Sequence, residues 1–136
     1  LRLGYLTAHR DIIAKLREFR TPWSVNSLAI EAGKYLVTHD INVLPSIDWM
    51  RKETEWFRES INQMEGFEAL PTQTNFFLVR LKYLNSSLLK ENLAIKEGIL
   101  IRDASSFEGL DDHYIRLATQ LHEENETLLT CLKQYL

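Results

Sequence analysis

The sequence is poor in cysteine, proline and glycine, with one, three and five residues of each type among 136. The single thiol, Cys131, excludes an internal disulfide framework and offers no cysteine pair to zinc, so we expect a small core residue and a reducing, cytoplasmic compartment. The chain also lacks a surplus of positive charge. Its 16 basic and 19 acidic residues give a formal net charge of -3, which argues against nonspecific binding of nucleic acid.

Long hydrophobic runs are missing too, and no segment resembles a signal peptide, so no membrane partner is expected. The 136 residues, 45% of them hydrophobic, suffice for one domain with its own core but not for two large ones. The four histidines are scattered without an i, i+4 pair, so no metal site is expected. The chain opens at Leu1 in a strand-like alternation without a leading turn, which suggests a piece of a longer protein.

Hydrophobic periodicity predicts an α+β fold in which a small sheet packs against helices. The first helix is capped by Asp11, the second is apolar all round and therefore expected to be buried, and the third places Glu53 on its solvent face. We expect a boundary between residues 1–44, a strand with two helices, and residues 45–136, a long helix followed by a β-α-β-β-α unit. Helices are expected over 12–19, 26–39, 45–66, 86–96 and 122–136, and strands over 1–8, 67–70, 74–81 and around Arg102 and Arg116.

Two arginines stand out because each lies in or beside a short run of β-branched and aromatic residues. Arg102 and Arg116 would place permanent cations on strands that should otherwise be apolar. A guanidinium is planar and presents a fork of donors, so two of them on adjacent strands form a receptor for a carboxylate or a phosphate. The alternative is a pair of structural ion pairs with acidic neighbours such as Asp103, Asp111 or Glu123.

Five short segments follow one another along the chain: Leu1-Arg-Leu-Gly-Tyr5, Pro22-Trp-Ser-Val-Asn26, Thr74-Asn-Phe-Phe-Leu-Val-Arg80, Ile101-Arg-Asp103 and Tyr114-Ile-Arg116. In residues, order and spacing they resemble the carboxyl-terminal part of a fold-type I pyridoxal-phosphate enzyme of the class I/II aminotransferase family. Within that family the resemblance is to the branch of histidinol-phosphate aminotransferases and threonine-phosphate decarboxylases. Residues 22–26 and 101–110 look more like the decarboxylases, which usually carry a cysteine where Ala104 stands.

The resemblance implies roles for five residues. Arg2 matches the arginine that grips the phosphate of the cofactor, pyridoxal 5'-phosphate. Arg116 matches the arginine that holds the α-carboxylate of the substrate, and Arg102 matches the one near the distal phosphate. Asn75 and Tyr5 lie in matching motifs and are given a supporting role in substrate binding. The lysine that binds the cofactor covalently lies upstream in this family, so no catalytic residue is expected in these 136 residues, which alone should be inactive.

The implied function is that of a pyridoxal-phosphate lyase or aminotransferase acting on a small phosphorylated amino acid as a homodimer. The favoured reaction is the decarboxylation of L-threonine O-3-phosphate in cobalamin biosynthesis, and the alternative is transamination of histidinol phosphate. A hypothesis from another class is a stand-alone regulatory module whose β-α-β-β-α unit binds a small anion.

Overall fold

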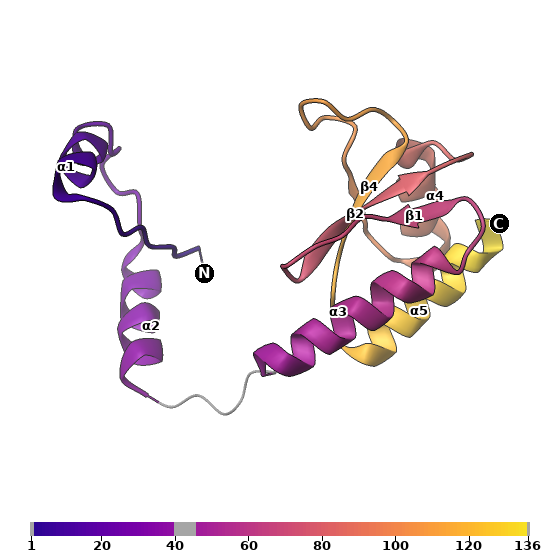
Figure 1. The fold of residues 1–136 in the computed structure, drawn as a ribbon, viewed down its shortest axis with the longest axis horizontal. Helices are drawn as coiled ribbons and strands as arrows, with labels where there is room; N and C mark the ends of the chain where they lie inside the picture. The colour runs from indigo at the N-terminus through magenta and orange to yellow at the C-terminus, as the bar shows by residue number, and fades with distance from the viewer. Residues whose placement is uncertain (1, 40–45, 136) are drawn as a thin grey trace. The chain divides into compact units, whose positions relative to one another are not determined.

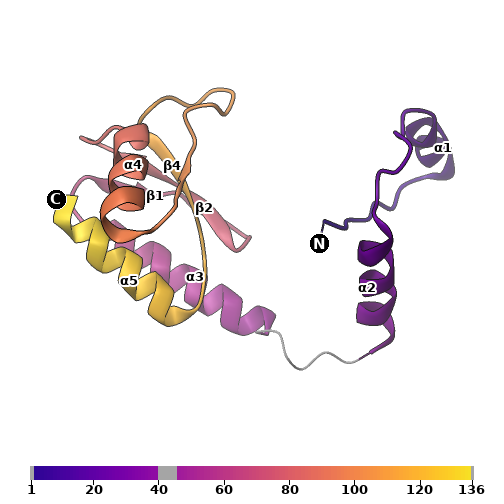
Figure 2. The same cartoon turned by 180° about the vertical axis from the view of Figure 1, so that it is seen from behind.

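A computed structural model describes residues 2–39 and 46–135 of the chain. The chain divides into two compact units, Leu1–Leu44 and Pro45–Leu136, and each is described by itself. Figures 1 and 2 show the elements of both units from opposite sides.

Residues 2–39 of the first unit form two helices, α1 (Arg10–Glu18) and α2 (Ser27–Thr38). The side chain of Asn26 caps α2 by accepting a hydrogen bond from the Ala29 amide at 2.8 Å, as its residue type favours. His9 caps α1, so the prediction of Asp11 as the cap is wrong. The strand predicted over residues 1–8 is also wrong for the described residues 2–8, because no strand among residues 2–39 pairs with it.

The apolar surface of α2 is largely uncovered by the described residues. Ala29 is buried, whereas Leu28 and Val37 are exposed. The expectation that this helix is buried on several sides is therefore not met within residues 2–39. Its apolar side chains point in all directions around the axis, and burying them takes more surface than α1 and residues 2–9 provide.

Residues 46–135 of the second unit form a four-stranded antiparallel sheet with three α-helices and one short 3-10 helix, which confirms the predicted α+β class. The strand order is β1-β2-β4-β3, so β3 forms one edge. The long helix ends before the predicted Gly66, and two strands precede α4, within the ranges 67–70 and 74–81 predicted for them. The elements are α3 (Ile47–Asn62), β1 (Phe67–Ala69), β2 (Phe76–Leu81), α4 (Ser86–Glu97), β3 (Arg102–Asp103), β4 (Tyr114–Ala118), α5 (His122–Leu132) and a short 3-10 helix (Lys133–Tyr135).

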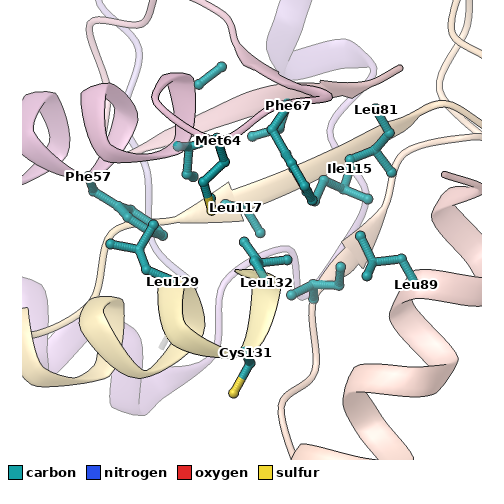
Figure 3. Close-up of a cluster of buried hydrophobic side chains, with 14 of the residues drawn as sticks. Phe57, Met64, Phe67, Leu81, Leu89, Ile115, Leu117, Leu129, Cys131 and Leu132 are labelled. Atoms are coloured by element: carbon teal, nitrogen blue, oxygen red, sulfur yellow. The ribbon is translucent and has the colours of Figure 1, made fainter. Parts of the chain in front are cut away.

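The core of this unit lies between one face of the sheet and the three helices (Figure 3). Alternate residues of β4, Ile115 and Leu117, are buried there, and Phe57 of α3 meets Phe77 of β2 edge to face with ring centroids 5.4 Å apart. Cys131 is buried in the same cluster, as expected. Because side chains alternate along a strand, the residues between these positions emerge on the opposite face, which we call the open face.

Candidate anion-binding site

The two arginines singled out in the sequence face each other across the β3–β4 pair. Arg102 is the direct register partner of Arg116 in this antiparallel ladder, so their side chains lie on the same face of the sheet. Like charges placed directly opposite destabilise a sheet by roughly 0.2–1 kcal/mol. The arrangement is therefore unfavourable for the sheet alone and favourable for binding an anion.

Neither arginine is neutralised by an acidic residue among residues 46–135. Elsewhere on the open face Arg80 does have such a partner, since its guanidinium lies 3.6 Å from the carboxylate of Glu68 on the neighbouring strand. The alternative in which Arg102 and Arg116 form structural ion pairs is wrong for the part of the second unit that the structure describes.

Asp103 has a different role from the one that this alternative gave it. Its carboxylate accepts hydrogen bonds from the hydroxyl of Ser87 at 2.6 Å, the amide of Ser105 at 2.9 Å and the hydroxyl of Ser86 at 2.8 Å. These bonds, led by the one from Ser87, hold the pKa of Asp103 well below its ordinary value. The carboxylate thereby ties β3, next to Arg102, to the first turn of α4.

Aromatic rings take the place of acids beside the arginines. The guanidinium carbon of Arg102 lies over the ring of Phe107, 5.6 Å from its centroid, and that of Arg116 lies over the same ring at 6.0 Å. Arg116 also lies over Phe76 of β2 at 5.4 Å. The face of a ring attracts a cation but leaves its charge intact, so both arginines are held and remain free to bind an anion.

A cavity of about 550 Å³ opens beside the two arginines, next to the segment that leads into β3 and the last residues of β4. Residues 98–102 and 116–118 line it together with side chains of α5. A volume of this order suits a small organic ligand. Arg102 and Arg116 both border this space, so a ligand with two anionic groups has room next to them.

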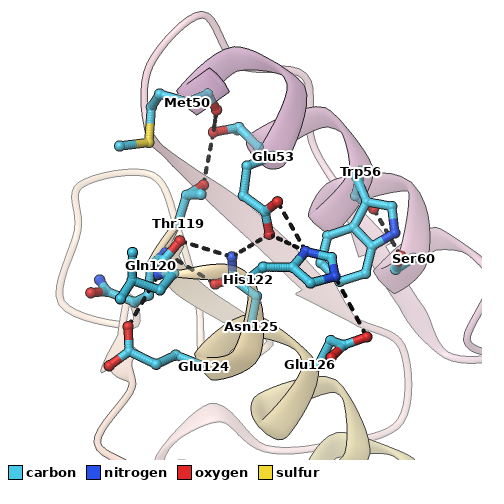
Figure 4. A network of polar contacts seen from close by, with 12 residues as sticks. Met50, Glu53, Trp56, Ser60, Thr119, Gln120, His122, Glu124, Asn125 and Glu126 are labelled. Carbon is cyan, nitrogen blue, oxygen red and sulfur yellow. Dashed lines mark hydrogen bonds and ion pairs between the residues drawn. The ribbon is translucent and has the colours of Figure 1, made fainter. Parts of the chain in front are cut away.

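Asn75, the third predicted substrate residue, stands immediately before β2 and is exposed. Its carbonyl accepts a hydrogen bond of 2.8 Å from the amide of Thr119, just after the strand of Arg116. The Thr119 hydroxyl lies 2.8 Å from that of Thr54 in α3, which in turn donates to the carbonyl of Met50 at 2.7 Å (Figure 4). This buried chain of hydrogen bonds fixes the end of β4 and the segment of Asn75 against α3.

A second polar network joins α3 to the start of α5 (Figure 4). The carboxylate of Glu53 lies 3.0 Å from Nδ1 of His122 and accepts a hydrogen bond of 2.8 Å from the amide of Asn125. Asn125 also bonds both backbone groups of Gln120, which follows β4. The bond to Glu53 raises the pKa of His122, and nearby Glu126 adds to the effect. Glu53 is buried, so its predicted place on the solvent face is wrong.

Arg2 and Tyr5, the remaining predicted residues, belong to the first unit. Both are exposed in a segment without regular structure, and Arg2 has no acidic partner among residues 2–39. The structure thus brings Arg102 and Arg116 together and places Asn75 just before β2, the strand next to that of Arg116. Arg2 and Tyr5 are described separately, in the first unit.

Several residues of the site could not be identified from the sequence alone. Phe107 gave one available signal, since it is the large aromatic side chain of a glycine-containing loop, residues 104–113. Glu53 and Asn125 gave none, because nothing local distinguishes them from solvated helix residues. Across the described ranges, no helix is long and apolar enough to span a bilayer. No cluster of metal-ligating side chains is found in those ranges either.

Comparison with known proteins places these features in a family. The family model of aminotransferase class I and II matches residues 1–132. The threonine-phosphate decarboxylase of Salmonella typhimurium is 33% identical over 137 residues, which cover 100% of this chain and 37% of the relative.

Solved structures agree with this match. The L-threonine-O-3-phosphate decarboxylase of Porphyromonas gingivalis superposes with a TM-score of 0.82 and 37% identity, over 94% of this chain and 39% of that one. The histidinol-phosphate aminotransferase of Clostridium acetobutylicum gives 0.77 and 30%, over 93% and 38%. The chain thus spans under two fifths of the length of these relatives. The resemblance read from the five sequence segments is confirmed, and the chain belongs to the aminotransferase class I and II family.

Proposed function

We propose that the full-length protein carrying this chain is a pyridoxal-phosphate enzyme that decarboxylates L-threonine O-3-phosphate. The observation that carries the proposal is the opposed pair Arg102 and Arg116, which have no acidic partner within residues 46–135 and border a cavity. The likeness to two threonine-phosphate decarboxylases supports the choice of substrate.

In this proposal the two arginines divide the anionic groups of the substrate. Arg116, half-buried on an inner strand, binds the α-carboxylate, and Arg102, exposed on the edge strand, binds the distal phosphate. A guanidinium binds either group through two parallel hydrogen bonds, which fix orientation as well as affinity. The bond of the substrate that breaks is chosen by how the carboxylate is held, so positioning by Arg116 is part of the chemistry.

Arg2 fits a role in holding the cofactor phosphate, because it is an exposed cation without an acidic partner among residues 2–39. When bound, the cofactor supplies the electron sink for the reaction, and the protein supplies binding and orientation. Asn75 and Tyr5 keep their proposed supporting role in substrate binding. In this proposal the lysine that binds the cofactor covalently lies upstream of Leu1 in the full-length protein, so residues 1–136 alone are expected to be inactive.

We assign residues 1–44 to the end of the large cofactor-binding domain and residues 45–136 to the small domain. The homodimer and the cytoplasmic compartment are part of the same proposal. The second candidate function is transamination of histidinol phosphate, which the 30% identity to a histidinol-phosphate aminotransferase favours. A stand-alone regulatory module is not supported, since the relatives named above are enzymes.

The test is an assay of the full-length protein with added cofactor. Release of carbon dioxide from L-threonine O-3-phosphate without any keto acid supports decarboxylation. Conversion of histidinol phosphate only when 2-oxoglutarate is present supports the aminotransferase instead. If the full-length protein acts on neither substrate, the proposal is wrong.

A further inference from the structure

Both arginines of the site share one aromatic ring. The guanidinium carbons of Arg102 and Arg116 lie 5.6 and 6.0 Å from the centroid of Phe107. The ring attracts both cations without neutralising them, and so offsets part of the repulsion between two like charges opposed in register. Phe107 therefore holds the pair in a geometry that the charges alone would disfavour.

The loop that carries Phe107 is fixed by its own backbone. The Ala104 amide donates to the Tyr114 carbonyl at 3.0 Å, the Phe107 amide donates to the Ala104 carbonyl at 3.0 Å, and the Leu110 amide donates to the Phe107 carbonyl at 3.0 Å. Asp103 adds a bond to the Ser105 amide at 2.9 Å. These bonds fix the backbone from which the ring of Phe107 projects, and they need no ligand.

The two arginines depend on this ring to different degrees. Arg116 is half-buried on an inner strand and also lies over Phe76 at 5.4 Å. Arg102 is exposed on a two-residue edge strand, and Phe107 is its aromatic contact within residues 46–135. Removing the ring of Phe107 frees Arg102 more than it frees Arg116.

We propose that Phe107 is a positioning residue that sets the preference for a phosphorylated amino acid over its unphosphorylated counterpart. It does so by holding Arg102 where the distal phosphate binds. Arg116, which also packs on Phe76, binds the carboxylate in either case. The inference rests on the proposed function, because it takes Arg102 as the phosphate ligand.

The experiment uses the full-length protein with its cofactor reduced by borohydride, so that the substrate binds but does not react. Calorimetry gives Kd for O-phospho-L-threonine and for L-threonine, and their ratio measures the phosphate preference. Phe107→Leu should lower this preference roughly two- to fivefold, the value of one cation–π contact at an exposed site. Phe76→Leu is the matched control and should weaken the binding of both ligands by the same factor. Phe107→Tyr, which keeps the ring, should retain the preference.

The outcomes separate this inference from the proposed function. A wild-type protein that does not prefer O-phospho-L-threonine overturns both. A wild-type protein with the preference and a Phe107→Leu variant that retains it in full overturn the role of Phe107 alone. Loss of the preference in Phe107→Tyr also overturns it, because the effect would then come from loop packing. Phe107→Met provides the same comparison if the leucine variant does not fold.

Discussion

Replacing Arg116 by methionine should separate binding from stability. Methionine keeps an unbranched apolar stem of similar length in the space beside Phe76 and Phe107 and removes the charge. Removing one partner of a desolvated charge pair costs about 2–5 kcal/mol of binding. We therefore expect the affinity of the full-length protein for O-phospho-L-threonine to fall by roughly 30-fold or more.

The stability of the protein should change little in the same variant. Relief of the repulsion from Arg102 stabilises the sheet by roughly 0.2–1 kcal/mol. Loss of the ring contacts destabilises it by about 0.5–1 kcal/mol each at exposed sites. These terms oppose each other, and Arg116 has two such ring contacts, so the free energy of unfolding should stay within about 2 kcal/mol of wild type.

Urea unfolding and calorimetry on the same preparations provide the assay. Arg80→Met is the matched control, since Arg80 lies on the same face but is paired with Glu68 at 3.6 Å. It should leave ligand binding unchanged and cost at most about 1 kcal/mol of stability, as for other exposed ion pairs. If Arg116→Met lowers stability by several kcal/mol and leaves binding intact, Arg116 is a structural residue and the reasoning fails.

Three further outcomes are expected. Arg102→Lys should weaken binding of O-phospho-L-threonine more than that of L-threonine in calorimetry, because lysine lacks the guanidinium fork; equal losses would remove Arg102 from the phosphate. Asp103→Asn should lower the free energy of urea unfolding by about 1–3 kcal/mol at neutral pH. Because the pKa of Asp103 is lowered in the folded state, the Asp103 carboxylate stabilises the fold above about pH 4, and this stabilisation is lost as the pH falls. The difference in unfolding free energy between wild type and Asp103→Asn should therefore shrink in acid. Glu53 raises the pKa of His122, so His122 stabilises the folded state below about pH 6.5, and this stabilisation is lost as the pH rises. His122→Gln should therefore flatten the decline of Tm with rising pH, and an unchanged decline would contradict this.

The elements of the second unit could be predicted where the signal is local. The end of helix α4 follows from Gly98, whose φ of 68° lies in the left-handed region that suits a glycine after a helix. The short strands around Arg102 and Arg116 follow from their β-branched and aromatic neighbours. The sequence also predicts that these two strands are adjacent, and the register pairing of Arg102 with Arg116 confirms it.

What could not be predicted depends on distant parts of the chain. Glu53 follows the charged pattern of a solvated helix face, but its carboxylate is buried because His122 and Asn125 reach it from α5. The ring of Phe107 reaches the arginines only through the turn geometry of its loop. The prediction of a strand at residues 2–8 is wrong for a related reason, since alternating residues form a strand only if a neighbouring strand pairs with them.

The central claim is that Arg102 and Arg116 are free cations that bind the two anionic groups of one phosphorylated amino acid. A crystal structure of the full-length protein, with its cofactor reduced by borohydride and O-phospho-L-threonine bound, tests it most directly. We predict the phosphate against Arg102 and the α-carboxylate against Arg116. Acidic side chains from the rest of the protein paired with both guanidinium groups, and the ligand bound elsewhere, would contradict the claim.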